Sequence, residues 1–395
     1  MITKNDLTEY FFQGIKSKHD MRIGVEHEKF VLNKNSLMPI TYDEKNGIKD
    51  ILQKFVSLGW APSYDDNEET IIALKKGKEA ITLEPGGQIE LSGAPLDNLH
   101  ETCEETTNHL MEVKSLSEEF NFILLGMGVE PNLTVDDFPW MPKQRYSIMK
   151  KYMMQVGTLG HHMMKRTCTN QVNIDYCSED DMIDKFRLML NLESIATAIF
   201  SNSPFDQGSI SKYKSLRSHF WHHTDQDRTG LIPFVFNKGF NFEKYTDYAL
   251  NVPMYFVTRK NKYIDMTKYT FKDYLEGRST DIKYEVTIKD WEDHLTTLFP
   301  QARLKQYLEI RSMDACNWDL ICSQPAFWIG ILYDTEIMDS VKNICEGWTK
   351  EDREYLNKNV PVQGLQTEFK SKKIINLAQE FYELSKKGLI KRKRL

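Results

Sequence analysis

The sequence has 395 residues, of which 41% are hydrophobic and 27% are charged, and its formal net charge is −6. This balance is typical of a soluble globular protein with a large core, and it provides no basic footprint for nucleic acid. The six cysteines form no CxxC pair, which argues against a zinc site and a disulfide scaffold. Residues 1–10 lack the apolar core of an export signal, and no apolar run reaches the length of a membrane span. We therefore expect a cytoplasmic protein with no membrane partner.

The segment from Arg22 to Phe30 predicts a β-strand whose acidic side chains share one face. Glu26 and Glu28 alternate with the apolar Ile23 and Val25, which point to the other face. Two carboxylates about 7 Å apart along a strand repel each other inside a fold unless a cation lies between them. This pattern indicates a Mg²⁺ site built from oxygen ligands. The alternative is a solvent-exposed strand whose glutamates bind nothing.

A second acidic pair, Glu84 and Glu90, flanks the break Pro85-Gly86-Gly87, where glycine lets the backbone approach another group closely. The alternative is a hairpin corner with exposed acids. Apolar spacing predicts strands over residues 70–74, 80–84, 88–92, 121–128 and 252–257, and helices over residues 48–58, 99–120, 181–200, 325–337 and 373–384.

Polar and basic residues suitable for a site occur in the middle of the chain. A strand over residues 167–175 places Gln171 and Asn173 on a polar face, which suits the floor of a site. Arg145 belongs to a basic pair for which surface solvation is the simpler reading. Arg217 lies in the polar segment 215–230, and its guanidinium can hold a carboxylate in a bidentate pair.

The same polar segment contains the adjacent histidines His222 and His223, which would point apart in a strand. We therefore rank metal binding by this pair below simple loop polarity. In the strand predicted over residues 252–257, Tyr255 is available to line a pocket.

The segment from Tyr307 to Met313 repeats the arrangement of the first strand, because Glu309 and Arg311 project together while Leu308 and Ile310 face the core. Acids that alternate with apolar residues on three separate strands must be neutralised, and divalent metals that bridge a polyphosphate do this. The chain has no GxxxxGK[ST] loop and no GxGxxG after a strand. The sequence thus predicts nucleotide chemistry outside the Walker and Rossmann classes.

Longer motifs are also present, and the sequence around them resembles one family. Over residues 22–389 the chain is similar to the plant and proteobacterial type of glutamate-cysteine ligase. The resemblance rests on GVEHEKF (24–30), LEPGGQIELSGAPLD (83–97), LGMGVEPN (125–132), MPKQRYSIM (141–149), residues 157–173, RSHFW and DRTGLIPFVF within 215–236, and YLEIRSMD (307–314).

This resemblance implies a fold and a reaction. The implied α+β fold is a glutamine-synthetase-like curved antiparallel sheet enclosed by helices, with Mg²⁺ and ATP on its concave face. The implied reaction joins the γ-carboxylate of L-glutamate to the amino group of L-cysteine, with ATP converted to ADP, as the first step of glutathione synthesis. We expect one catalytic domain over residues 1–395, present as a monomer or a redox-dependent homodimer.

The resemblance also implies roles for individual residues. Arg145 and Arg217 would hold glutamate, Arg311 would face the transferred phosphoryl group, and Tyr255 would line the cysteine pocket. Gln171 and Asn173 match the floor of the site. The implied metal and phosphate shell comprises Glu26, Glu28, Glu84, Glu90 and Glu309, with Glu309 also close to the catalytic Arg311.

The chain departs from the family in two respects. Cys103 and Cys322 match one regulatory cysteine pair of plant members, whereas Met266 and residues 277–284 lack the other, so we expect a disulfide between Cys103 and Cys322 only. Family members also usually continue beyond the position of Leu395. Three alternatives remain open: a ligase of the same fold with another amine acceptor, a phosphotransferase of the guanidino-kinase kind, and a catalytically inactive binding protein.

Overall fold

The structure is a computed structural model that describes residues 2–65 and 69–392, and a large antiparallel sheet runs through it. Within these residues nine strands form the sheet in the order β14-β15-β7-β1-β5-β4-β3-β2, while β6 pairs with the far end of β1. Its strands are β1 (Ile23–Asn33), β2 (Ala61–Tyr64), β3 (Ile71–Lys76), β4 (Glu79–Leu83), β5 (Ile89–Ser92), β6 (Phe122–Leu125), β7 (Asn170–Ile174), β14 (Ala302–Leu304) and β15 (Leu308–Ile310).

The register of these strands places polar residues beside one another on one face of the sheet. Glu26 lies opposite Gln171, Glu28 lies opposite Glu90, and Glu309 lies opposite Asn173. Because side chains alternate along each strand, the apolar residues between these positions face the other side. The predicted α+β fold with an antiparallel sheet is confirmed.

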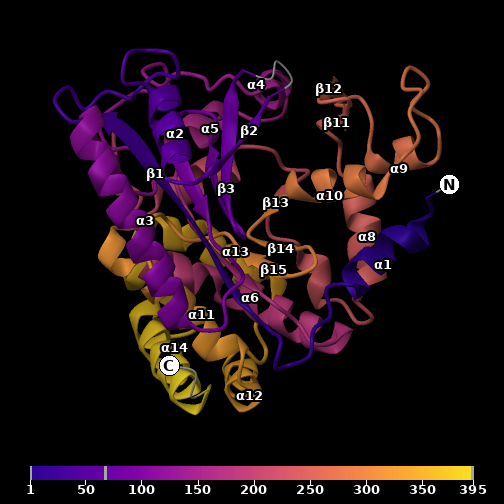
Figure 1. Ribbon diagram of the computed structural model, residues 1–395. Helices are drawn as coiled ribbons and strands as arrows, with labels where there is room; N and C mark the ends of the chain where they lie inside the picture. Colours follow the sequence, from indigo (N-terminus) through magenta and orange to yellow (C-terminus); the bar gives the residue numbers. More distant parts are fainter. Residues whose placement is uncertain (1, 66–68, 393–395) are drawn as a thin grey trace.

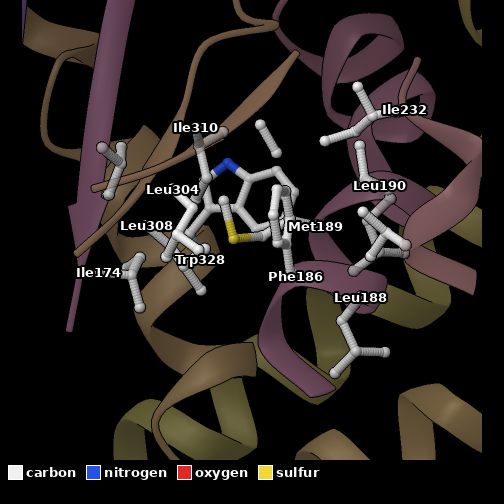
Figure 2. Packing of buried hydrophobic residues seen from close by; sticks show 14 of the residues in the cluster. Ile174, Phe186, Leu188, Met189, Leu190, Ile232, Leu304, Leu308, Ile310 and Trp328 are labelled. Atoms are coloured by element: carbon white, nitrogen blue, oxygen red, sulfur yellow. The ribbon is translucent and has the colours of Figure 1, made fainter. Parts of the chain in front are cut away.

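Helices pack against the apolar face of the sheet. Figure 1 shows α3 (Leu99–Phe120) beside the long strand β1, and α11 (Ser323–Leu332) packed beside α14 (Ile374–Arg392). In Figure 2 the buried Trp328 of α11 lies among side chains of the sheet and of α6 (Glu179–Ile199), including Leu304, Ile310 and Met189. This core fixes the position of strands β7, β14 and β15.

A second group of elements covers the polar face. It includes α4 (Gln144–Val156), α5 (Gly160–Arg166), α7 (Leu216–His222), α10 (Ile288–Thr296) and the hairpin of β11 (Phe256–Arg259) and β12 (Lys262–Asp265). The remaining elements are α1 (Lys4–Phe12), α2 (Ile48–Ser57), α8 (Phe242–Asn251), α9 (Phe271–Leu275), α12 (Thr335–Ile344), α13 (Lys350–Gln363), β8 (Phe205–Asp206), β9 (Ser209–Ile210), β10 (Thr229–Gly230), β13 (Phe299–Pro300), β16 (Glu368–Phe369) and β17 (Lys372–Lys373). None of the described helices combines the length and apolar content that a membrane span requires.

Local capping explains two differences from the sequence predictions. The polar segment predicted as a loop contains α7, whose N-cap Ser215 accepts a hydrogen bond from the Ser218 amide. The helix predicted over residues 325–337 is broken after Leu332, because Asp334 caps the start of α12 through the amide of Ile337. The first strand and the helix over residues 99–120 are confirmed.

Candidate functional site

A cavity of about 400 Å³ lies between the polar face of the sheet and the elements that cover it. This volume is in the range of sites that bind small molecules. Its wall carries the acids Glu26, Glu28, Glu84 and Glu90 and the cations Lys143, Arg145, Arg217, Arg303 and Arg311. The structure therefore brings together residues from across the chain that the sequence placed on separate strands and helices.

Glu26 is held in place by two amide side chains of the neighbouring strand β7. The Nδ2 of Asn173 donates to Oε1 at 2.9 Å, and the Nε2 of Gln171 donates to Oε2 at 3.2 Å. Gly24 lies opposite Asn173, and a Cβ there would come within 3.1 Å of the Asn173 side chain. The glycine thus leaves the space that Asn173 uses to reach Glu26.

Glu28 and Glu90 lie directly across from each other on β1 and β5. One oxygen of Glu28 accepts from the Thr169 amide at 2.9 Å, and one oxygen of Glu90 accepts from the Ser92 hydroxyl at 2.5 Å. Burial, together with neighbouring glutamates, raises the pKa of both carboxyls, that of Glu90 to about 8. Like charges opposite each other destabilise a sheet, so a cation at this position would stabilise the protein.

Glu84 enters the cavity from the turn between β4 and β5. The Glu84 amide donates to the Gln88 carbonyl at 2.9 Å, and the Gly87 amide donates to the Glu84 carbonyl at 3.0 Å. At Gly86 a Cβ would lie only 2.5 Å from the Lys165 carbonyl oxygen. The turn therefore packs so closely on the end of α5 that a larger residue would displace the Glu84 side chain.

Glu309 lies in a different electrostatic environment from the other four acids. Its side chain is fully buried and forms ion pairs with Arg303 at 2.5 Å, Arg311 at 2.8 Å and Lys305 at 3.2 Å. Burial acts to raise the pKa of Glu309, but the three cations, Arg303 foremost, outweigh it and hold this pKa well below its usual value. A carboxylate already paired with three cations is poorly suited to bind metal, so the geometry disagrees with the predicted metal-ligand role of Glu309.

Arg311 connects the acids of the cavity with its cations. One nitrogen of its guanidinium donates to Glu309 at 2.8 Å and to the Oε1 of Gln171. The same Gln171 donates to Glu26, so its side-chain amide links the acidic Glu26 to the basic Arg311. The Arg311 carbonyl in turn accepts from the Arg217 guanidinium at 3.0 Å.

Two wall residues were not singled out by the sequence predictions. Arg303 lies opposite Glu309 on β14, and an alternation of Ala302, Arg303 and Leu304 was the signal that could have found it. Lys143 donates to the Leu83 carbonyl at 2.7 Å. Burial and the nearby Arg145 lower the pKa of Lys143 to about 7, so this side chain titrates close to neutral pH.

Comparison with known proteins shows to which family the protein belongs. The sequence profile of glutamate-cysteine ligase family 2 (GCS2) matches residues 22–394. The chain belongs to this family. It is 50% identical over 393 residues to glutamate–cysteine ligase B, chloroplastic, of Oryza sativa subsp. japonica, covering 99% of this chain and 78% of the relative. It is 48% identical over 396 residues to the chloroplastic glutamate–cysteine ligase of Arabidopsis thaliana, covering 99% of this chain and 74% of the relative.

A solved structure shows the same fold at much lower sequence identity. The glutamate–cysteine ligase of Francisella tularensis in complex with AMP aligns with a TM-score of 0.53 at 13% identity, covering 95% of this chain and 79% of that chain. Together, the family match and the close relatives show that the activity is glutamate-cysteine ligation, the first step of glutathione synthesis. The two relatives are chloroplastic proteins, and a cytoplasmic location for this family member stays a prediction.

The predicted acceptor residue Tyr255 does not reach the cavity wall. Its ring is buried against Tyr152 at 5.3 Å and under the Arg228 guanidinium at 3.9 Å, and its hydroxyl contacts the sulfur of Met153. The next residue, Phe256, lines the cavity instead. Contact between Tyr255 and cysteine therefore stays a prediction, and it requires a rearrangement of this wall.

The carboxyl groups of the cavity suit a metal ion that binds together with the nucleotide. Among residues 2–65 and 69–392, no group of three or more His, Cys, Asp and Glu side chains is placed to hold a metal ion. Mg²⁺ in nucleotide sites typically takes one or two carboxylates and completes its octahedron with waters and phosphate oxygens. Glu28 and Glu90 lie opposite each other on the cavity wall, so their two carboxyl groups fit such an ion.

The two cysteines predicted to pair lie next to each other on separate helices. Cys103 belongs to α3 and Cys322 precedes α11, and both thiols are free and partly buried. Burial and the neighbouring Cys103 thiol together raise the pKa of Cys322 to about 12. The positions permit the predicted disulfide, which stays a prediction.

Proposed function

We propose that this cavity ligates L-glutamate to L-cysteine through a γ-glutamyl phosphate formed from ATP. The observation that carries the proposal is the arrangement of charges: one cavity is lined by carboxylates on β1, on β5 and in the turn between β4 and β5, and by cations on β14, on α7 and directly after β15. A carboxylate is a poor electrophile, so it must be activated, and ATP supplies the phosphoryl group for this purpose.

The acids would hold Mg²⁺ and the nucleotide phosphates. We assign this role to Glu26, Glu28, Glu84 and Glu90, which line the cavity. When bound, Mg²⁺ would offset the negative charge of the phosphate oxygens. Gln171 and Asn173 would act through Glu26, because their amides fix the orientation of its carboxylate.

Arginines would hold glutamate and the transferred phosphoryl group. Arg145 and Arg217 line the cavity, and a guanidinium matches a carboxylate in a bidentate pair. The buried Nε of Arg217 has no hydrogen-bond partner among the described residues, which leaves a donor for a substrate. Arg311 would stabilise charge on the phosphoryl group in flight, while Glu309 would keep Arg311 and Arg303 in position.

The proposed reaction has two steps, a phosphoryl transfer and an acyl transfer. A γ-carboxylate oxygen of glutamate attacks the γ-phosphorus of ATP, and the bond from that phosphorus to ADP breaks. The cysteine nitrogen then attacks the acyl carbon and gives up a proton, and inorganic phosphate leaves with the electron pair of the C–O bond. The cavity must exclude water, because hydrolysis of the acyl phosphate would waste ATP.

An ATP-consumption assay with glutamate and a series of amines tests this proposal. We expect ADP release that depends on cysteine and yields equal amounts of ADP and dipeptide. Release that depends on another amine would indicate a ligase with a different acceptor. ADP release without any amine, together with a stable phosphorylated compound, would indicate a guanidino-kinase-like phosphotransferase and contradict the proposal.

We also propose that Cys103 and Cys322 form a disulfide under oxidising conditions. The Cys103 thiol is near enough to that of Cys322 to raise its pKa. Non-reducing peptide mass spectrometry after oxidant treatment should find this link, while Cys168, Cys177, Cys316 and Cys345 stay reduced. Both thiols free after that treatment would contradict it, and size-exclusion chromatography with and without reductant would test the redox-dependent homodimer.

A further inference from the structure

A second cavity of about 300 Å³ lies on the far side of the catalytic cavity, between α7 and α13. A small void of about 20 Å³ separates the two. This void shares Arg217 and Arg311 with the catalytic cavity and shares His222 and Gly230 with the second cavity. The three spaces therefore neighbour one another in a row from the predicted phosphoryl site to the second cavity.

Residues with unpartnered buried polar atoms line the void, which distinguishes it from a purely apolar packing defect. Among the described residues, five buried polar atoms on its lining have no hydrogen-bond partner: Arg217 Nε, Trp221 Nε1, His222 Nε2, Gln301 Oε1 and Ser312 Oγ. Arg217 and Ser312 are only 3% and 5% exposed. Buried polar groups are normally satisfied by protein or by water, and this volume is enough for about one water molecule. We therefore regard the void as a hydrated passage.

The charges along the row favour an anion that moves outward. The charged residues that line the passage are Arg217 and Arg311, and no carboxylate among the described residues lines it. Farther out, the second cavity carries Lys350 and Arg353 and a single acid, Glu354, which pairs with Lys350 at 3.5 Å. The wall of the catalytic cavity, in contrast, carries four glutamates among its five cations. An anion released beside Arg311 therefore meets carboxylates on the catalytic side, whereas the charged groups of the passage are guanidinium groups alone.

We propose that the passage and the second cavity release inorganic phosphate by a route separate from that of the nucleotide. This inference rests on the proposed acyl-phosphate reaction, which frees phosphate next to Arg311. Because the passage holds about one water molecule, phosphate transit requires it to widen. His222 lies at the junction of passage and second cavity, so its side chain controls the width there.

A bulky side chain at the junction tests the route. We expect His222→Trp to slow phosphate release about tenfold or more while dipeptide formation within one turnover changes less than about twofold, because product release is separable from chemistry. A fluorescent phosphate-binding reporter measures the first rate, and rapid quench measures the second. His223→Trp is the matched control, because His223 is the exposed neighbour and its ring bonds the His219 carbonyl.

A charge reversal provides a second test that does not depend on a buried substitution. Lys350→Glu should slow phosphate release roughly threefold at low salt and less at high salt, since exposed charges are screened. Lys358→Glu, on the exposed side of the same helix and outside the cavity lining, should have no such effect. Phosphate release at the control rate in folded His222→Trp, or in Lys350→Glu if the first variant does not fold, would overturn the inference. Absence of dipeptide in the unmodified protein would instead refute the proposed ligation.

Discussion

Two regions of the same sheet face show how differently one residue type can be used. Glu28 and Glu90 lie among other acids, and their pKa values are raised by burial and by like charge. Glu309, only two strands away from β1, is surrounded by three cations that hold its pKa low. The first region lacks positive charge, which a ligand can supply. In the second region, cations of the protein itself neutralise the charge of Glu309. Strand alternation places all three on one face, but the neighbouring strands decide what each can do.

The largest expected effect comes from the cationic region. Arg311→Ala should lower kcat by roughly 1,000-fold, because one preorganised donor to a developing charge contributes 10²–10³ in rate. Arg311→Lys keeps the positive charge but loses the planar, forked donors of the guanidinium, so its kcat should be only partly restored relative to Arg311→Ala. ADP release at saturating substrates measures both variants, with circular dichroism as the test of folding. A loss below tenfold in Arg311→Ala would remove this residue from the phosphoryl step.

Removing the central acid of the cationic region should affect stability more than metal binding. Glu309→Gln leaves three cations without their partner, and breaking a buried ion pair costs about 3–5 kcal/mol. Chemical denaturation should show this loss, whereas the Mg²⁺ concentration for half-maximal activity should change less than about threefold, because Glu309 already has its cations. A large rise in that Mg²⁺ concentration would restore Glu309 as a metal ligand.

Removing one acid of the other region should have the opposite outcome. Glu28→Gln should raise the half-saturating Mg²⁺ concentration roughly 100-fold, because loss of even an outer partner of a metal ligand costs 10–100-fold. Glu79→Gln is the matched control, since Glu79 lies on β4 outside the cavity lining. Equal Mg²⁺ dependence in both variants would contradict the assignment.

The smallest expected effect is a pH dependence of the metal-free protein. The pKa of Glu90 is raised from 4.5 to about 8, so the folded state holds this proton more tightly than the unfolded chain. Its contribution to stability is complete below about pH 4.5 and is lost as pH rises to about 8. In the presence of a chelator, Tm should fall more steeply between about pH 5 and 8 in the unmodified protein than in Glu90→Gln. Parallel pH profiles would show that Glu90 is not the titrating group.

The strand pattern predicted the acids well because alternation is a local property. Glu26, Glu28, Gln171 and Asn173 are on the expected face, since period two fixes the side of each residue once one side is apolar. Arg303 lies opposite Glu309 because β14 and β15 form a hairpin, and it was missed because a strand of three residues gives only a short alternation. The helix over residues 99–120 was predictable from its apolar spacing.

Other misses have similar causes. The family resemblance placed Tyr255 in the cysteine pocket, but its ring packs against Tyr152 and Phe256 lines the cavity. The sequence cannot show which of two adjacent aromatic residues faces a cavity. Lys143 looked like an ordinary surface lysine, because its burial arises only when α4 packs over the turn that contains Glu84. The strand predicted over residues 121–128 is present as β6, but it pairs with the end of β1 and is not central.

The amide of Gln171 has a consequence for the order in which ligands bind. Its oxygen is committed to Arg311 and its nitrogen to Glu26, so it cannot flip without losing both contacts. A ligand that shifts Glu26 therefore changes the binding free energy of a ligand that contacts Arg311. By thermodynamic reciprocity, the second ligand changes the binding free energy of the first by the same amount. With Glu26 as a metal ligand and Arg311 as a substrate contact, as proposed, this single side chain would couple metal occupancy to substrate affinity.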